Sequence, residues 1–217
     1  FLQAMTSGEL VGKATLRRFW QPRTLTGGKR GWFAAGWEYG ESDGYRQVGH
    51  DGGTRVRARI VFKDLLDADV FAFAYMTNGS ARNVWSRVLM DSAMAATAPE
   101  RFPAEALAEK LTAHALAKPA GSDMRAWAQS IRMNGALTDA ELERTVNNTG
   151  YTLRENLGAG AASPVFELNT VLFPASANAW DSLAEAHAAR GDTDAATAAR
   201  EKSRQLAIPA GSDHPGR

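Results

Sequence analysis

The sequence contains no cysteine, which excludes disulfide bonds, thiolate metal sites and a cysteine nucleophile. It has no apolar run close to the roughly 18 residues that a membrane-spanning helix needs. Its first residues, 1–5, also lack the basic and apolar regions of a secretory signal. The 25 Lys and Arg residues nearly balance the 24 Asp and Glu residues, for a net charge of +1. This balance gives no electrostatic reason to expect nucleic acid or an anionic membrane as a partner.

The composition is otherwise ordinary. The chain has 217 residues, of which 44% are hydrophobic and 23% are charged. These values are typical of a globular protein with one large or two small domains. The four histidines show no metal-ligand spacing, since His114, His187 and His214 lie far apart along the chain.

Four stretches in the first hundred residues have the alternation or the apolar, β-branched and aromatic content of strands. In residues 54–62, Val56, Ala58, Ile60 and Phe62 share one predicted face, and three arginines share the other. Residues 70–76 are nearly all apolar, which predicts a strand buried on both faces. We therefore predict an antiparallel meander of about four strands, formed by residues 32–39, 45–48, 54–62 and 70–76.

Helices are predicted on both sides of this meander. Residues 1–20 have helical spacing with a break at Ser7-Gly8-Glu9, and a further helix should begin near Asn78 or Ser80 and end before Pro99. Two more helical stretches follow, Pro103–Ala117 and Asp123–Met133.

The segment Val48-Gly49-His50-Asp51-Gly52-Gly53-Thr54 surrounds one histidine with three glycines. Glycine allows the backbone to pass close to another group, and inside a strand pattern it marks a bulge or the close approach of a ligand. Two interpretations remain open from the spacing: a tight hairpin turn with an exposed histidine, or a strand against which a ligand lies.

The order of three short motifs resembles a known superfamily. Gly36-Trp37-Glu38-Tyr39 comes first, then the His50 segment, then an apolar strand that closes on Thr77-Asn78-Gly79. This arrangement is similar to the C-terminal half of the serine β-lactamase and penicillin-binding-protein superfamily, especially class C β-lactamase-like proteins and related esterases. The resemblance covers about residues 1–97 and includes one of the three family motifs, the His-x-Gly-Gly form of the third. It implies no cofactor and a periplasmic or secreted location.

The resemblance also implies roles for the residues of this motif. His50 takes the place of the family's lysine and supplies charge or a hydrogen bond, and the Gly53 N–H would help to hold the oxyanion. Gly52 keeps an edge strand bare beside the substrate, and Asp51, Thr54 and Arg55 would contact the substrate. Arg55 could pair with a substrate carboxylate, although a solvated or helix-paired arginine face is the alternative.

The nucleophile of this family is absent from the sequence. The chain contains no Ser-x-x-Lys and no Tyr-x-Asn, and its one Ser-x-Asn, Ser176-Ala177-Asn178, is predicted to be a helix-capping turn. We therefore expect a fragment that is inactive alone and that would act on a small acyl substrate (β-lactam, ester or D-amino-acid peptide) only within a longer parent.

The last part of the chain repeats with an offset of 34 residues. Gly150 then aligns with Ala184, and Ala162 with Ala196. This is the period of tetratricopeptide helix pairs, and the segment 139–208 resembles that family. A non-catalytic module that binds a protein partner through these repeats is the alternative function.

The overall prediction is an α+β fold: an antiparallel sheet of about four strands flanked by helices, followed by an all-α tetratricopeptide-like helical hairpin domain. The expected segments are the hydrolase-like portion 1–98, a helical linker 99–138, the repeats 139–208 and a disordered tail 209–217.

Overall fold

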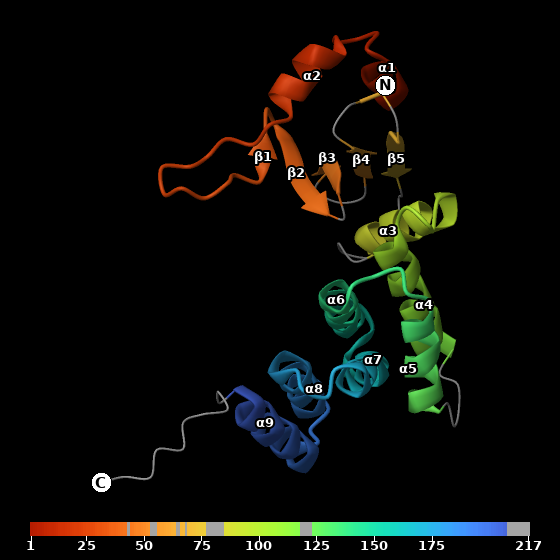
Figure 1. Cartoon of the computed structure of the whole chain (residues 1–217), viewed down its shortest axis with the longest axis vertical. Helices are drawn as coiled ribbons and strands as arrows, with labels where there is room; N and C mark the ends of the chain where they lie inside the picture. The colour runs from red at the N-terminus through yellow and green to blue at the C-terminus, as the bar shows by residue number, and fades with distance from the viewer. Residues whose placement is uncertain are drawn as a thin grey trace. The chain divides into compact units, whose positions relative to one another are not determined.

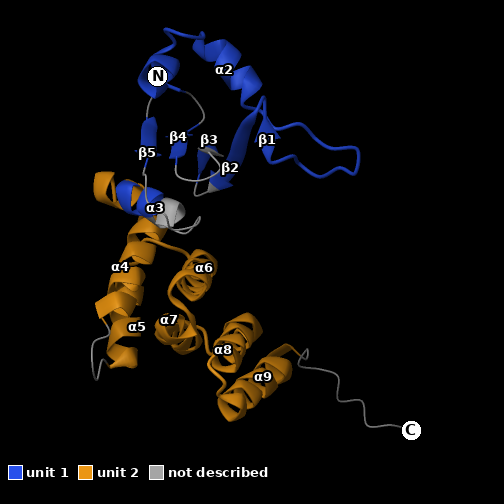
Figure 2. Ribbon diagram, turned by 180° about the vertical axis from the view of Figure 1, so that it is seen from behind, with its two compact units in different colours: residues 1–93 blue, residues 94–217 orange. Residues whose placement is uncertain are grey.

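The structure is a computed structural model that describes residues 1–42, 44–52, 56–63, 66–67, 69–76, 85–117 and 123–207. The chain divides into two compact units, Phe1–Ala93 and Met94–Arg217, coloured separately in Figure 2. The division falls inside helix α3 (Trp85–Thr97), a few residues before the predicted boundary at residue 98. The predicted start of this helix near Asn78 or Ser80 and the predicted disordered tail 209–217 lie outside the described residues.

Two short helices open the first unit, α1 (Leu2–Ser7) and α2 (Lys13–Phe19). The predicted break between them is confirmed. Gly8 ends α1 with a positive φ of 89°, a conformation that glycine adopts without steric cost and that often ends a helix.

The described strands form one antiparallel sheet in the order β1-β2-β3-β4-β5 (Figure 1). The antiparallel sheet and the α+β class are confirmed, but the sheet has five strands where about four were predicted. The predicted strand 32–39 is two short strands, because Ala35 and Gly36 adopt positive φ values of 49° and 86° and turn the chain back on itself. The strands are β1 (Phe33–Ala34), β2 (Trp37–Ser42), β3 (Tyr45–Gly52), β4 (Val56–Phe62) and β5 (Phe71–Met76).

One face of this sheet packs against α1 and α2. In the register of the strands, Tyr39 lies opposite Val48 and Val48 lies opposite Ile60, so these side chains share a face. Trp20, next to the end of α2, is buried against this face, with its ring centroid 5.6 Å from that of Phe62. We call this side of the sheet the Trp20 face. Its buried core consists of Met5, Leu16, Trp20, Val48, Ile60, Phe62 and Leu66.

The opposite face carries the arginines of β4, as their alternation predicted. The side chain of Arg59 is only 17% exposed, and its Nη1 lies 3.9 Å from the Oδ1 of Asp91 on α3. Of the alternatives for the arginine face, pairing with a helix therefore applies to Arg59.

The prediction that β5 is buried on both faces is wrong. Ala72, Ala74 and Met76 are exposed on the Trp20 face, and Met76 is 76% exposed, while the alternate residues are half-buried. The reason is that β5 is the last strand of the described sheet and that the core of the Trp20 face ends near Ile60.

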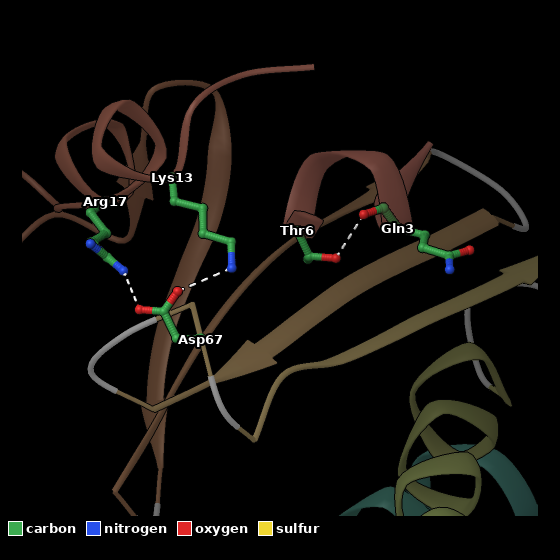
Figure 3. Close-up of polar contacts among 5 residues, drawn as sticks. All are labelled: Gln3, Thr6, Lys13, Arg17 and Asp67. Carbon is green, nitrogen blue, oxygen red and sulfur yellow. Dashed lines mark hydrogen bonds and ion pairs between the residues drawn. The ribbon is translucent and has the colours of Figure 1, made fainter. Parts of the chain in front are cut away.

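An ion-pair cluster ties α2 to the segment between β4 and β5 (Figure 3). The Nζ of Lys13 lies 3.0 Å from one carboxylate oxygen of Asp67, and the Nη2 of Arg17 lies 2.8 Å from the other. The hydrogen bond from Lys13, with the positive charges of both residues, lowers the pKa of Asp67. In the same view the hydroxyl of Thr6 donates to the backbone oxygen of Gln3 inside α1.

The described secondary-structure elements of the second unit are all helices. The predicted stretch Pro103–Ala117 is helix α4. The predicted stretch Asp123–Met133 is α5, in which Asp123 is the N-cap and its carboxylate accepts from the N–H groups of Arg125 and Ala126. The helices that follow are α6 (Asp139–Leu157), α7 (Ala159–Leu172), α8 (Ala177–Ala189) and α9 (Thr193–Ala207).

The helices α6 to α9 pack consecutively against one another. The first residues of α7 and α9, Ala159 and Thr193, are 34 positions apart, which matches the offset found in the sequence. The hydroxyl of Ser176 caps α8 by accepting from the N–H of Ala179 at 3.1 Å. The capping turn predicted for Ser176-Ala177-Asn178 is therefore confirmed.

Candidate functional site

The His50 motif lies on β3, which is an inner strand. Glu38 of β2 pairs with Gly49 on one side of β3, and Arg59 of β4 pairs with Gly49 on the other. The edge strand that the family resemblance implied is therefore not observed in the described sheet. The reason is that β2 pairs with the side of β3 that faces away from β4.

The pairing with β2 nevertheless stops at Gly49. Strand β2 begins at Trp37, where the chain turns back into β1. Strand β3 continues through His50, Asp51 and Gly52, in register with Ala58, Arg57 and Val56 of β4. The motif therefore extends past the end of β2.

His50 is exposed and lies on the Trp20 face, two residues beyond the buried Val48. His50 belongs to strand β3 and not to a turn. Of the two interpretations of this segment, the tight hairpin turn with an exposed histidine is therefore wrong for His50. The core of the Trp20 face does not extend to this position, since Val56, opposite Gly52, is 45% exposed. The histidine is therefore accessible at the open half of the face.

Only part of the predicted site falls within the described residues. Gly53, Thr54 and Arg55 lie outside them, as does the side chain of Asp51. For Gly52 the structure gives the pairing with Val56 of β4. The roles predicted for these residues stay predictions.

The first glycine of the motif has a structural explanation. A Cβ atom placed on Gly49 would lie 2.4 Å from the backbone oxygen of Ala58, closer than any real contact. The backbone of β4 therefore occupies the space of a side chain at this position. The group that comes close to the backbone at Gly49 is therefore the backbone of the neighbouring strand β4.

A polar cluster lies beside the motif on β2. The hydroxyl of Tyr39 donates to one oxygen of Glu41, and the Nη1 of Arg30 lies 3.0 Å from the other. Burial raises the pKa of Tyr39 to about 12, and the hydrogen bond to Glu41 and its negative charge act in the same direction. At neutral pH Tyr39 is therefore a hydrogen-bond donor and not a base. The pKa of Glu41 is shifted in the other direction, because the hydrogen bond from Tyr39 lowers it.

A second feature beside His50 was not predicted from the sequence. A cavity of about 420 Å³ is lined by residues from the end of α2 to β1, among them Phe33. The ring centroid of Phe33 lies 6.5 Å from that of His50, so one residue of the cavity's lining lies near the motif. The adjacent aromatic residues Trp32 and Phe33 were the available signal, but the alternation of the segment indicated only a strand.

In the described part of the chain, no group of His, Asp and Glu side chains is placed to hold a metal ion. None of the described helices has the length and apolar character needed to cross a bilayer.

No protein-family model, no curated protein and no solved structure matches this chain.

Proposed function

We propose that this chain is the C-terminal portion of a β-lactamase-like serine hydrolase, in which it forms one wall of the active site. The observation that carries the proposal is the position of His50. This histidine is exposed on β3, beyond the end of β2 and at the open half of the Trp20 face. An acyl substrate could reach it there without displacing the core of the unit.

The chemistry follows from what this wall can supply. A serine attacking an acyl carbonyl forms a tetrahedral intermediate, whose negative charge is stabilised by donors already in place. His50 would provide a hydrogen bond or positive charge to the substrate, and Gly53 a backbone N–H to the oxyanion. The sequence contains no Ser-x-x-Lys, so the nucleophile would come from a part of the protein outside these residues, and this chain alone would be inactive.

The test uses a longer reading frame that contains a Ser-x-x-Lys motif ahead of Phe1. Turnover of a chromogenic β-lactam and of a nitrophenyl ester is measured for the parent and for His50→Ala. Loss of a positioned donor lowers kcat/KM by roughly a hundredfold. Gln47→Ala is the matched control, since Gln47 lies on the same strand three residues away and its loss should leave turnover unchanged. Equal turnover in parent and His50→Ala, or no such upstream motif, would remove the proposal.

A second function is favoured by α6 and α8. The Nη1 of Arg154 on α6 lies 2.7 Å from the Oε2 of Glu185 on α8. The hydroxyl of Tyr151 on α6 lies 3.1 Å from the hydroxyl of Ser182 on α8. These contacts, with the 34-residue spacing, support a tetratricopeptide-like pair of hairpins that binds a peptide partner. A peptide selected on the full chain should bind His50→Ala as well as it binds the parent, and should lose affinity when α6 or α8 is substituted on its exposed face. Selected peptides that bind only the first unit would exclude this second function.

A further inference from the structure

The cavity beside Phe33 has an unusual lining. We call it the aromatic hollow and define it by Arg18, Phe19, Arg23, Leu25, Trp32 and Phe33. Its volume of about 420 Å³ lies within the range of about 300–1,000 Å³ that is typical of small-molecule sites. All of its lining residues belong to the first unit, so the hollow is a feature of that unit alone.

The apolar side chains of the hollow are exposed together. Trp32 is 66% exposed, Leu25 55%, Phe19 50% and Phe33 40%. The rings of Trp32 and Phe33 lie with their centroids 4.1 Å apart. A single exposed apolar residue needs no explanation, but several that line one cavity mark a binding surface.

The charged side chains of the hollow are of one sign. Arg18 and Arg23 line it and are exposed, and its lining includes no acidic residue. Neither arginine forms an ion pair with a described residue, whereas Arg17, Arg30 and Lys13 nearby are paired with Asp67 or Glu41. Guanidinium groups bind carboxylates in a two-pronged geometry, so the hollow is complementary to an apolar group that carries a carboxylate.

We propose that the aromatic hollow binds small carboxylates with an aromatic or bulky apolar body, with Trp32 and Phe33 against the body and Arg18 and Arg23 at the carboxylate. This inference rests on the proposed function in one respect: Phe33 joins the hollow to His50, so the bound group would be the part of the acyl substrate remote from the reacting carbonyl. The substrates would then be apolar acyl compounds that bear a second, anionic carboxyl group.

The experiment titrates the 217-residue chain with 2-naphthoate and follows binding by tryptophan fluorescence and by calorimetry. The uncharged 2-naphthamide has nearly the same shape and should bind about tenfold more weakly, a factor that corresponds to about 1.4 kcal/mol. Arg18→Gln with Arg23→Gln should remove this preference for the anion. Trp32→Ser should weaken both ligands about tenfold, because it removes the apolar wall.

The matched control carries the same change of charge elsewhere. Arg144→Gln with Arg200→Gln alters two exposed arginines of the helical unit and should leave naphthoate binding unchanged. Since the substituted residues of the hollow are exposed, the variants should keep the circular dichroism spectrum and unfolding temperature of the parent.

Three results would overturn the proposal. The first is no saturable binding of 2-naphthoate, and the second is equal affinity for the acid and the amide. The third is self-association that Trp32→Ser abolishes, measured by sedimentation without ligand, which would assign the hollow to a second copy of the chain. Because the titration needs no serine nucleophile, its failure removes the hollow as a site, while turnover by the His50→Ala parent separately tests the proposed function.

Discussion

Gly150→Ala tests how closely α6 and α7 approach each other. Gly150 is buried in the interior of α6, and a Cβ placed there would lie 2.6, 2.8 and 2.9 Å from Cε1, Cζ and Cδ1 of Phe166 on α7. The ring of Phe166 is fully buried and meets that of Tyr151 edge-on, with centroids 5.1 Å apart. The ring therefore has little room to move away from an added methyl group.

Two effects of opposite sign decide the magnitude. Replacing glycine by alanine inside a helix stabilises it by roughly 0.5–1 kcal/mol. Forcing one more carbon into a packed core costs typically about 1–3 kcal/mol. Because three ring atoms would lie under 3.0 Å from the new methyl, we place the cost at the upper end. With that cost at about 2–3 kcal/mol, the expected net change is a loss of about 1–2.5 kcal/mol in the free energy of unfolding.

The assay is urea unfolding of the full chain, followed by the helical circular dichroism signal. Gly160→Ala is the matched control, since Gly160 lies in α7 with nothing within 4 Å of the added Cβ, and it should be neutral or slightly stabilising. Phe166→Leu should cost less in the Gly150→Ala background than alone, because the smaller side chain makes room for the methyl group. If Gly150→Ala were as stable as Gly160→Ala, the close packing of α6 on α7 would be refuted.

Two further predictions concern ionisable groups of the first unit. Because the folded pKa of Tyr39 is raised from 10.0 to about 12, its contribution to stability is complete below about pH 10 and is lost as pH rises through 12. Glu41→Gln should lower the pKa of Tyr39 but leave it above 10, because the burial of Tyr39 remains. The pKa is measured by tyrosinate absorbance, with Tyr39→Phe as the reference. An unchanged titration of Tyr39 in Glu41→Gln would contradict the hydrogen bond. Because the pKa of Asp67 is lowered from 3.8, its contribution is present above that pH and is lost as pH falls through the folded value. The small difference in unfolding temperature between the parent and Asp67→Asn should therefore shrink in acid and in high salt, and a difference that stays constant down to pH 2 would exclude the ion pairs.

Local patterns in the sequence predicted most of the helices. The stretch Pro103–Ala117 is helix α4 with the predicted bounds, and Asp123 and Ser176 are N-caps as their residue types indicated. Helix ends depend on caps and breakers within a few residues, so a linear reading captures them. The first residues of α7 and α9 are also 34 positions apart, which is the offset at which the sequence pattern recurs.

Strand burial and strand position could not be obtained in this way. Residues 70–76 are nearly all apolar, yet Ala72, Ala74 and Met76 are exposed, because burial depends on whether another element covers that half of the sheet. β3 is an inner strand because β2 pairs with one of its sides and β4 with the other. A turn is local in the sequence, but whether a strand becomes an inner or an edge strand depends on its pairing with distant segments.

The candidate site, too, could be predicted from the sequence only in part. The glycines around His50 marked the segment from the sequence alone, since few other settings favour that composition in a strand. The exposure of His50, the contact of Gly49 with the backbone of β4 and the hollow next to Phe33 depend on residues that are distant along the chain. Composition and periodicity report what each segment prefers, whereas accessibility and cavities arise only when the folded strands and helices bring their surfaces together.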